Sequence, residues 1–200
     1  VNAVDICEGY LREYLLNPME ALVHDWDKQP RPKPGKMMVR PKERLAIASA
    51  VLKRKLAIPL RKELLLYING EPLVNGSFGV DKGKVLPESH EQYPGEMVLR
   101  WILNLTATNS MITPLDADIR ALPFCGQWRC IVLENGEVLL WSFEDLKGAF
   151  YLFALPHSWA PLFALDWEFG ADELQVFDCD PATRVWLGIV VMPMGFCNAA

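Results

Sequence analysis

The sequence predicts an α+β fold with helices near the N-terminus and strands in the later part of the chain. Apolar residues recur at helical spacing within residues 1–27 and again within residues 42–56. We expect Pro59 to end the second of these helices. Residues 98–105 and 185–192 are short apolar runs that favour buried strands. Helices followed by short strands are typical of this fold class.

Turn and linker signals separate these segments. Residues 28–36 alternate three prolines with basic residues, which predicts an extended linker. The dipeptides Asn69-Gly70 and Asn75-Gly76 predict turns. Residues 81–95 are polar and rich in Gly and Pro, which favours a mobile loop.

The clearest local signal is a β-hairpin centred on Asn135-Gly136. This dipeptide lies between the β-prone residues 130–133 and 138–143, and Asn-Gly between two such runs favours a two-residue hairpin turn. The returning strand would deliver Glu144 and Asp145 at its end.

The composition excludes several classes of protein. The chain has 200 residues, 51% hydrophobic and 22% charged, so it can bury a core and is not disordered throughout. Its net charge of −5 excludes a uniformly basic nucleic-acid coat. No apolar run reaches the roughly 18 residues of a membrane helix, and no secretory signal precedes the body of the chain. Because the chain opens on Val1, we interpret it as part of a longer protein.

Charge is distributed unevenly along the chain. Residues 28–62 hold twelve of the twenty Lys and Arg with Glu43 as the only acid, whereas residues 134–200 hold ten acids against two bases. One surface would then attract phosphates, and another would gather carboxylates that could hold metal ions. Two solvated faces without a ligand explain the same pattern.

Cysteine usage indicates a reducing compartment inside the cell, the cytoplasm or the nucleus. The five cysteines are odd in number and scattered, which argues for free thiols. The three histidines are too dispersed to complete a zinc site with Cys125 and Cys130.

Three segments carry the candidate chemistry. The first joins Phe78-Gly-Val-Asp-Lys-Gly-Lys84 to residues 98–109, the second is Ser142-Phe-Glu-Asp-Leu-Lys-Gly-Ala-Phe-Tyr151, and the third is Met192-Pro-Met-Gly-Phe-Cys-Asn-Ala199. Taken alone, Asp145 of the second segment has two interpretations. At a strand end beside small residues it suits Mg²⁺, which prefers carboxylate oxygens, but it would equally cap a following helix.

In this order, the three segments resemble the fingers and palm motifs of reverse transcriptases of retroelements, from about residue 70 to residue 200. The resemblance implies a polymerase-like fingers and palm fragment, with N-terminal helices and a partial antiparallel palm sheet. Residues 1–68 would form a helical region with a basic, proline-rich linker, and match no motif of the family. Residues 69–200 would form a partial reverse transcriptase domain.

The resemblance also implies a chemical role for each matching residue. Asp145 would be catalytic, as one of the two or three carboxylates that bind a pair of Mg²⁺ ions, which activate the primer 3′-hydroxyl and stabilise the leaving pyrophosphate. Arg100, together with Lys82 or Lys84, would bind the triphosphate of the incoming nucleotide. Phe150 would exclude a 2′-hydroxyl and so favour deoxynucleoside triphosphates.

The third segment would contact the substrates directly. Met194 and Gly195 would lie against the nucleotide and the template base, because glycine allows the backbone to approach closely. The implied partners are an RNA or DNA template with its primer, and deoxynucleoside triphosphates.

The chain also departs from the family's pattern. Asn104 and Thr106 stand where many relatives have Asp and Arg, Met194 replaces a common Gln, and Glu144 adds a negative charge before Asp145. The family's aromatic-x-Asp-Asp motif should follow the third segment, and no two aspartates are adjacent in this chain. We therefore expect these 200 residues not to polymerise DNA by themselves.

Two other functions stay open. The chain could be a non-catalytic remnant of a retroelement that retains binding to nucleic acid. It could also be an unrelated α+β domain, in which case Arg100, Asp145 and Gly195 would not converge in space.

Overall fold

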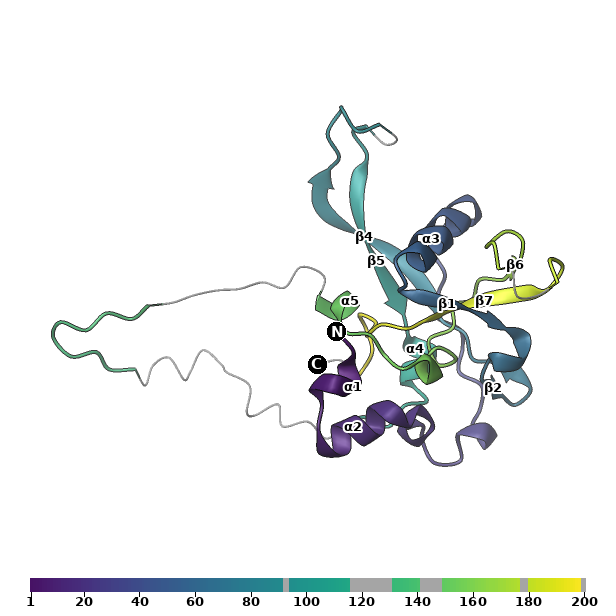
Figure 1. Cartoon of the computed structure of the whole chain (residues 1–200), viewed down its shortest axis with the longest axis horizontal. Helices are drawn as coiled ribbons and strands as arrows, with labels where there is room; N and C mark the ends of the chain where they lie inside the picture. The colour runs from purple at the N-terminus through teal and green to yellow at the C-terminus, as the bar shows by residue number, and fades with distance from the viewer. Residues whose placement is uncertain (92–93, 116–130, 141–148, 177–179, 199–200) are drawn as a thin grey trace.

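The computed structural model describes residues 1–91, 94–115, 131–140, 149–176 and 180–198, with Ala149 and Phe150 described by their backbone alone. It is a mixed α+β structure of short helices and small antiparallel sheets, which confirms the predicted fold class at this level. Figure 1 shows the hairpin of β4 and β5 projecting from the body of the molecule. Within the described ranges, no helix combines the length and the apolar character that crossing a membrane requires.

A three-stranded antiparallel sheet joins distant parts of the chain. Its order is β1-β7-β6, with β1 at Ala57–Arg61, β7 at Arg184–Ile189 and β6 at Phe169–Gly170. The central strand β7 confirms the strand predicted within residues 185–192. β1 pairs with β7 from Ala57↔Ile189 to Arg61↔Val185, so strands from the N-terminal and C-terminal parts of the chain share one sheet.

The basic helix predicted after residue 42 is α3, at Pro41–Lys53, and it begins with a proline in its first turn. Its end differs from the prediction. Lys55 has a φ of 56°, and this left-handed residue turns the chain into β1 before Pro59 is reached. Pro59 lies in β1, at the edge of the sheet, where a missing N–H is tolerated.

The longest strand pair is β4, at Gly76–Val85, with β5, at Met97–Asn104. β5 confirms the strand predicted at residues 98–105. The loop predicted over residues 81–95 is wrong in its first part, because β4 continues through an irregularity between Asp81 and Val85 to pair Val85 with Met97. Backbone pairing with the long strand β5 outweighs the polar composition of this stretch.

The remaining elements are short. Two-residue strands β2 (Tyr67–Ile68) and β3 (Glu71–Pro72) flank Asn69 and Gly70, whose φ angles of 49° and 78° confirm the predicted turn. The short helices are α1 (Ala3–Ile6), α2 (Gly9–Leu16), α4 (Thr106–Asn109) and α5 (Ala149–Leu152), with 3-10 turns at Pro18–Ala21, Trp26–Lys28, Lys62–Leu64 and His157–Trp159. The helix predicted within residues 1–27 is confirmed by α2, and the separate short helix α1 precedes it. Gly9, the first residue of α2, has a φ of 54°.

The proline-rich segment at residues 28–36 has no helix or strand beyond the end of one 3-10 turn, which agrees with an extended linker. Its last residues nevertheless pack on the body. Gly35 approaches Gly76 and Asn104 so closely that a Cβ on Gly35 or Gly76 would collide with the facing backbone. Just beyond, the Met38 N–H donates to the Ser77 carbonyl at 2.9 Å.

Asn75 is fully buried, and the turn predicted at Asn75-Gly76 is wrong. Its amide nitrogen donates to the carbonyls of Leu162 at 3.0 Å and Ala164 at 3.1 Å. Its amide oxygen accepts from the backbone N–H of Thr108 at 3.4 Å and lies 3.0 Å from the Thr108 hydroxyl. The residue thus joins the start of β4 to α4 and to the loop that contains Leu162.

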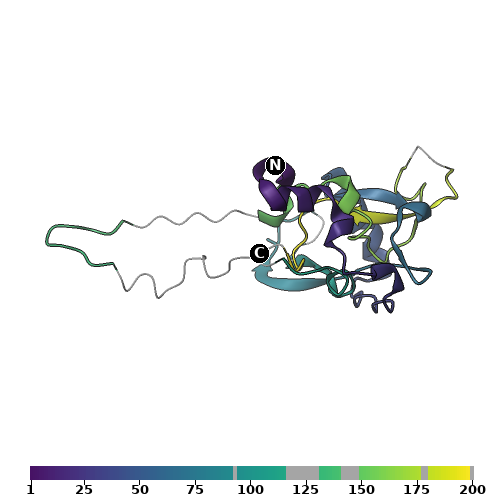
Figure 2. The ribbon, with the colours of Figure 1, turned by 90° about the horizontal axis from the view of Figure 1, so that it is seen from below.

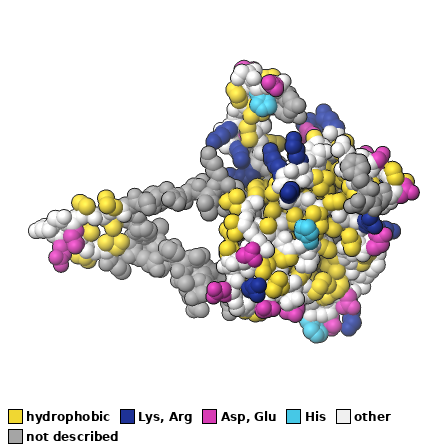
Figure 3. Space-filling view, viewed as in Figure 1, with side chains coloured by type: hydrophobic (Ala, Val, Ile, Leu, Met, Phe, Trp, Pro, Cys, Tyr) yellow, Lys and Arg dark blue, Asp and Glu magenta, His cyan; other side chains and the backbone are white. Residues whose placement is uncertain are grey.

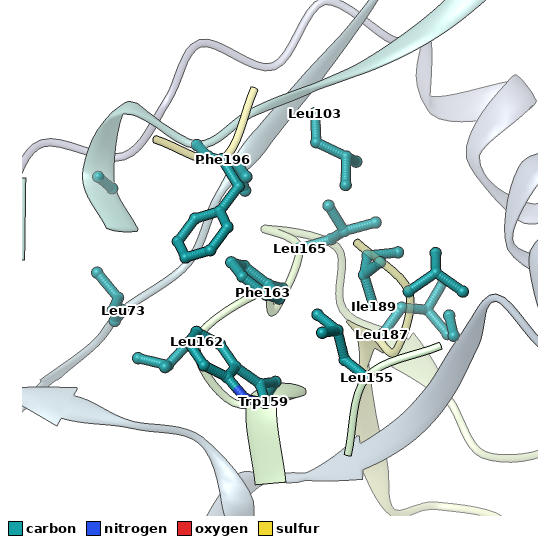
Figure 4. Packing of buried hydrophobic residues seen from close by; sticks show 14 of the residues in the cluster. Leu73, Leu103, Leu155, Trp159, Leu162, Phe163, Leu165, Leu187, Ile189 and Phe196 are labelled. Atoms are coloured by element: carbon teal, nitrogen blue, oxygen red, sulfur yellow. The ribbon is translucent and has the colours of Figure 1, made fainter. Parts of the chain in front are cut away.

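An aromatic cluster lies at the centre of the core. Trp159 is fully buried and stacks on Phe163, with 5.6 Å between the ring centroids. Phe196 meets both rings edge-on, and the ring centroids of Tyr14 and Trp159 are 5.6 Å apart. Figure 4 shows Trp159, Phe163 and Phe196 packed among leucines from several elements. The third candidate segment therefore contributes Phe196 to the core of the protein.

The predicted hairpin at Asn135-Gly136 is confirmed as a turn only. The Glu137 N–H donates to the Glu134 carbonyl at 3.0 Å, and Gly136 has a φ of 97°. The described residues 131–140 contain no strand, and their apolar side chains are exposed. Turn chemistry is local, whereas strands also need a partner surface that buries one face.

We expect Asn75→Ala to destabilise the protein strongly, by about 3 kcal/mol, because it removes the amide bonds to the Leu162 and Ala164 carbonyls and leaves the buried Thr108 N–H without its acceptor. Chemical unfolding monitored by circular dichroism measures the change. Asn17→Ala is the control, because its side chain makes one exposed hydrogen bond, to the Glu13 carbonyl at 3.2 Å. An equal effect of the two substitutions would contradict the role assigned to the buried amide.

Burial raises the pKa of the Tyr14 hydroxyl to about 12, against the opposing effect of its hydrogen bond from Asn198. The unfolded phenol titrates near 10 and loses its proton first, so the free energy of unfolding should fall as the pH rises from about 10 to about 12. Below about pH 10 this stabilisation is present in full.

Tyr14→Phe should remove that part of the pH dependence, because phenylalanine does not titrate. Urea unfolding at about pH 8, 10 and 11 measures it, with the exposed Tyr10→Phe as the matched control. If Tyr10→Phe flattens the profile as much as Tyr14→Phe does, the assignment to Tyr14 is wrong.

Candidate functional site

Three of the predicted substrate-binding residues lie on the β4–β5 hairpin. Arg100 in β5 is paired with Val80, while Lys82 and Lys84 lie in the irregular stretch of β4 between Asp81 and Val85. All three cationic side chains are exposed, and none has an ion pair within the described part of the chain. They are therefore available to an anionic ligand, as a role in triphosphate binding requires.

Tyr151 connects the second segment to this hairpin. Its hydroxyl donates to the backbone carbonyl of Trp101 at 3.2 Å, directly beside Arg100. Burial raises the pKa of the Tyr151 hydroxyl, and the positive charge of Arg100 acts in the opposite direction. The family motif assigns no role to Tyr151, although it directly follows Phe150.

Trp101 holds the opposite face of β5 against the body. Its ring stacks on Trp167 with 6.2 Å between the centroids, and Trp167 donates its indole N–H to the Met37 sulfur at 2.8 Å. The Trp101 indole nitrogen itself is buried without a hydrogen-bond partner. Side chains alternate between the faces of a strand, so anchoring Trp101 directs Arg100 to solvent.

The third segment is tied to the residues that follow β5. The Asn109 side chain donates to the Gly195 carbonyl at 2.7 Å and accepts from the Cys197 N–H at 3.2 Å. Gly195 has a φ of 100°, which favours glycine, and a Cβ at this position would lie 3.2 Å from the Leu103 carbonyl. Gly195 is exposed and Met194 is half-buried, so both lie at the surface of this turn.

Asn198 makes a second attachment of the same segment. Its amide nitrogen donates to the Tyr14 hydroxyl at 2.8 Å and to the Thr113 carbonyl at 3.2 Å. Its amide oxygen accepts from the Leu115 N–H at 3.0 Å. The end of the third segment is thereby fastened both to α2 and to the chain after α4.

Asn104 and Thr106, which depart from the family's pattern near the end of β5, both form structural hydrogen bonds. The Thr106 hydroxyl donates to the Asn104 side-chain oxygen at 2.7 Å, at the start of α4. The Asn104 amide nitrogen donates to the Lys36 carbonyl at 3.5 Å, on the proline-rich segment. These polar side chains join β5, α4 and the linker.

The remaining predicted site residues cannot be placed. Asp145 and Glu144 lie outside the described residues, and Phe150 is described by its backbone in α5 alone. Among the described residues there is no group of three or more His, Cys, Asp or Glu that could hold a metal ion.

A second basic region lies on α3. We define the α3 basic surface as Lys42, Lys53, Arg54 and Lys55, which are all exposed. Figure 3 shows Lys and Arg side chains gathered over α3 and over the lower part of the β4–β5 hairpin, on one face of the molecule. In the view at right angles to Figure 1, residues 131–140 also project from the body (Figure 2).

Comparisons with models of protein families, with curated proteins and with solved structures found no match to this chain.

We expect Asn109→Ala to loosen the turn at residues 193–197, because it removes the acceptor of the Cys197 N–H and the donor to the Gly195 carbonyl. Hydrogen exchange of a peptide covering this turn should be faster by about fivefold, as for the loss of about 1 kcal/mol of local stability. Ser110→Ala is the control, because its hydroxyl bonds only to the Ala107 carbonyl at 2.7 Å. Unchanged exchange in Asn109→Ala would show that other contacts hold the turn.

Proposed function

We propose that this chain supplies the fingers and the front of the palm of an RNA-directed DNA polymerase of a retroelement. The observation that carries the proposal is that the three candidate segments meet. Tyr151 bonds to the carbonyl beside Arg100, and Asn109 bonds on both sides of the Gly195–Cys197 turn. Segments that form one substrate site must converge, whereas unrelated segments have no such requirement.

In this proposal the hairpin binds the triphosphate of the incoming deoxynucleotide. Arg100 offers a planar fork of donors for phosphate oxygens, and Lys82 or Lys84 adds a second positive charge. Because Trp101 is packed on Trp167 and its carbonyl is bonded to Tyr151, the strand that carries Arg100 is held in place. The triphosphate then meets a donor whose backbone position is already determined.

The other roles follow the resemblance. Phe150 would exclude the 2′-hydroxyl, while Met194 and Gly195 would lie against the nucleotide and the template base. Asp145 would hold Mg²⁺, which supplies charge stabilisation to phosphoryl transfer when it is bound. Of the described residues, Arg100, Lys82 and Lys84 on the hairpin would bind and orient the phosphates.

A non-catalytic nucleic-acid-binding remnant is the second candidate function. It is favoured by the exposed cations of the α3 basic surface. It requires salt-sensitive binding to nucleic acid that is unaffected by Asp145→Asn. In the polymerase proposal, the same substitution abolishes the Mg²⁺ dependence of nucleotide binding.

Titration of the chain with a fluorescent deoxyadenosine triphosphate analogue (MANT-dATP) in Mg²⁺ tests the first proposal. We expect saturable binding that Arg100→Gln weakens by about 30-fold, as for the loss of about 2 kcal/mol of charge-assisted hydrogen bonding. Arg12→Gln is the control, because it removes an exposed charge from α2, outside the hairpin. Equal affinity of wild type and Arg100→Gln would reject the proposed triphosphate site.

The same titration with the ribonucleotide analogue tests the role of Phe150. Phe150→Ala should reduce the preference for the deoxynucleotide, because the smaller side chain leaves room for a 2′-hydroxyl. If Phe150→Ala prefers the deoxynucleotide over the ribonucleotide as strongly as the wild type does, Phe150 does not exclude the 2′-hydroxyl.

A further inference from the structure

We propose that α3 binds the phosphate backbone of a nucleic-acid duplex, at a surface separate from the nucleotide site. The exposed side of α3 includes Lys42 at its first turn and Lys53 at its last, followed directly by Arg54 and Lys55. This inference does not rest on the proposed polymerase function, because α3 lies in the N-terminal region outside the three candidate segments.

The length of α3 suits a row of phosphates. Lys42 and Lys53 are eleven residues apart, which corresponds to about 16 Å along the helix axis. Phosphates of one duplex strand follow each other at about 3.4 Å along the duplex axis, so this distance covers about five of them. Cations at both ends of α3 can therefore contact the same duplex.

The cations of the α3 basic surface are not neutralised by the protein. Within the described part of the chain, Lys42, Lys53, Arg54 and Lys55 form no ion pair. The acid of this helix, Glu43, is paired with Arg40 instead. A polyanion would therefore release its own counterions on binding without first breaking a salt bridge.

The residues between the two ends of the surface favour a duplex over a single strand. Ala46, Ser49 and Ala50 are exposed and small, so they allow a sugar–phosphate backbone to approach the helix. Residues 40–55 contain no aromatic side chain on which an unpaired base could stack. Binding should therefore be directed at the backbone of a duplex.

A membrane surface is less well matched to α3. A helix that lies in a membrane interface inserts its apolar side between the lipids. On α3 that side is already occupied, because Ala48 and Val51 are buried in the core and Ile47 and Leu52 pack against it. Charge attraction alone would remain available to an anionic membrane.

Fluorescence anisotropy with a labelled RNA duplex of about 20 base pairs tests the proposal, at salt concentrations between about 50 and 200 mM. Combining Lys42→Gln, Lys53→Gln and Arg54→Gln should weaken binding by at least tenfold. It should also lower the slope of log affinity against log salt by about two to three, one for each lost phosphate contact.

The control combines Arg12→Gln, Lys33→Gln and Lys62→Gln, which removes the same charge from exposed positions outside α3. A second pair of variants changes Ser49, at the exposed centre of α3, and tests the proposal if the triple variant fails to fold. Ser49→Glu should weaken duplex binding, whereas Ser49→Gln, of the same size, should not.

Three results would overturn the proposal. The first is wild-type affinity and salt slope in the α3 triple variant, or an equal loss in its control. The second is tighter binding of the unpaired RNA strand than of the duplex. The third is retention on anionic lipid vesicles that depends on α3 in the absence of duplex binding. None of them bears on the MANT-dATP titration, so this inference and the polymerase proposal can fail separately.

Discussion

The buried amide of Asn75 is the constraint on which the arrangement around the β4–β5 hairpin depends. A buried amide without partners is costly, and the partners of Asn75 come from distant segments, Thr108 on α4 and the carbonyls of Leu162 and Ala164. Its own N–H also donates to the Ala164 carbonyl at 2.8 Å. Because these bonds join the start of β4 to α4 and to the loop that contains Leu162, Asn75 fixes β4 relative to α4, and so relative to Asn109, which meets the last segment.

β5 connects this core to the surface that we propose as functional. Trp101 and Leu103 face the body, where Trp101 stacks on Trp167 and Leu103 is buried, while Arg100 points to solvent. The two-residue period of a strand makes both arrangements possible on one element. The hydrogen bond from Tyr151 to the Trp101 carbonyl adds a second attachment at this position. A strand that is attached to the body and carries an unpaired cation suits the binding of phosphate.

The basic residues are used in two different ways. Arg40 is paired with Glu43, and Arg31 with Glu71, so part of the N-terminal charge is neutralised by the protein. The cations of the α3 basic surface remain exposed and unpaired in the described part of the chain, where solvent and salt limit their mutual repulsion. The uneven charge that is visible in the sequence therefore survives on the folded surface only where ion pairs do not remove it.

Local chemistry determined the elements that the sequence predicted correctly, whereas contacts between distant segments decided the rest. Asn69-Gly70 forms the expected turn, because two left-handed residues suffice for it. Asn75-Gly76 is the same dipeptide, yet it becomes a buried junction and a strand start, because its partners lie far along the chain. The motif in the sequence also proposed Arg100, and its role in binding stays a prediction. The contributions of Tyr151 and Asn109 depend on residues about 50 and 86 positions away, which only the tertiary structure brings together.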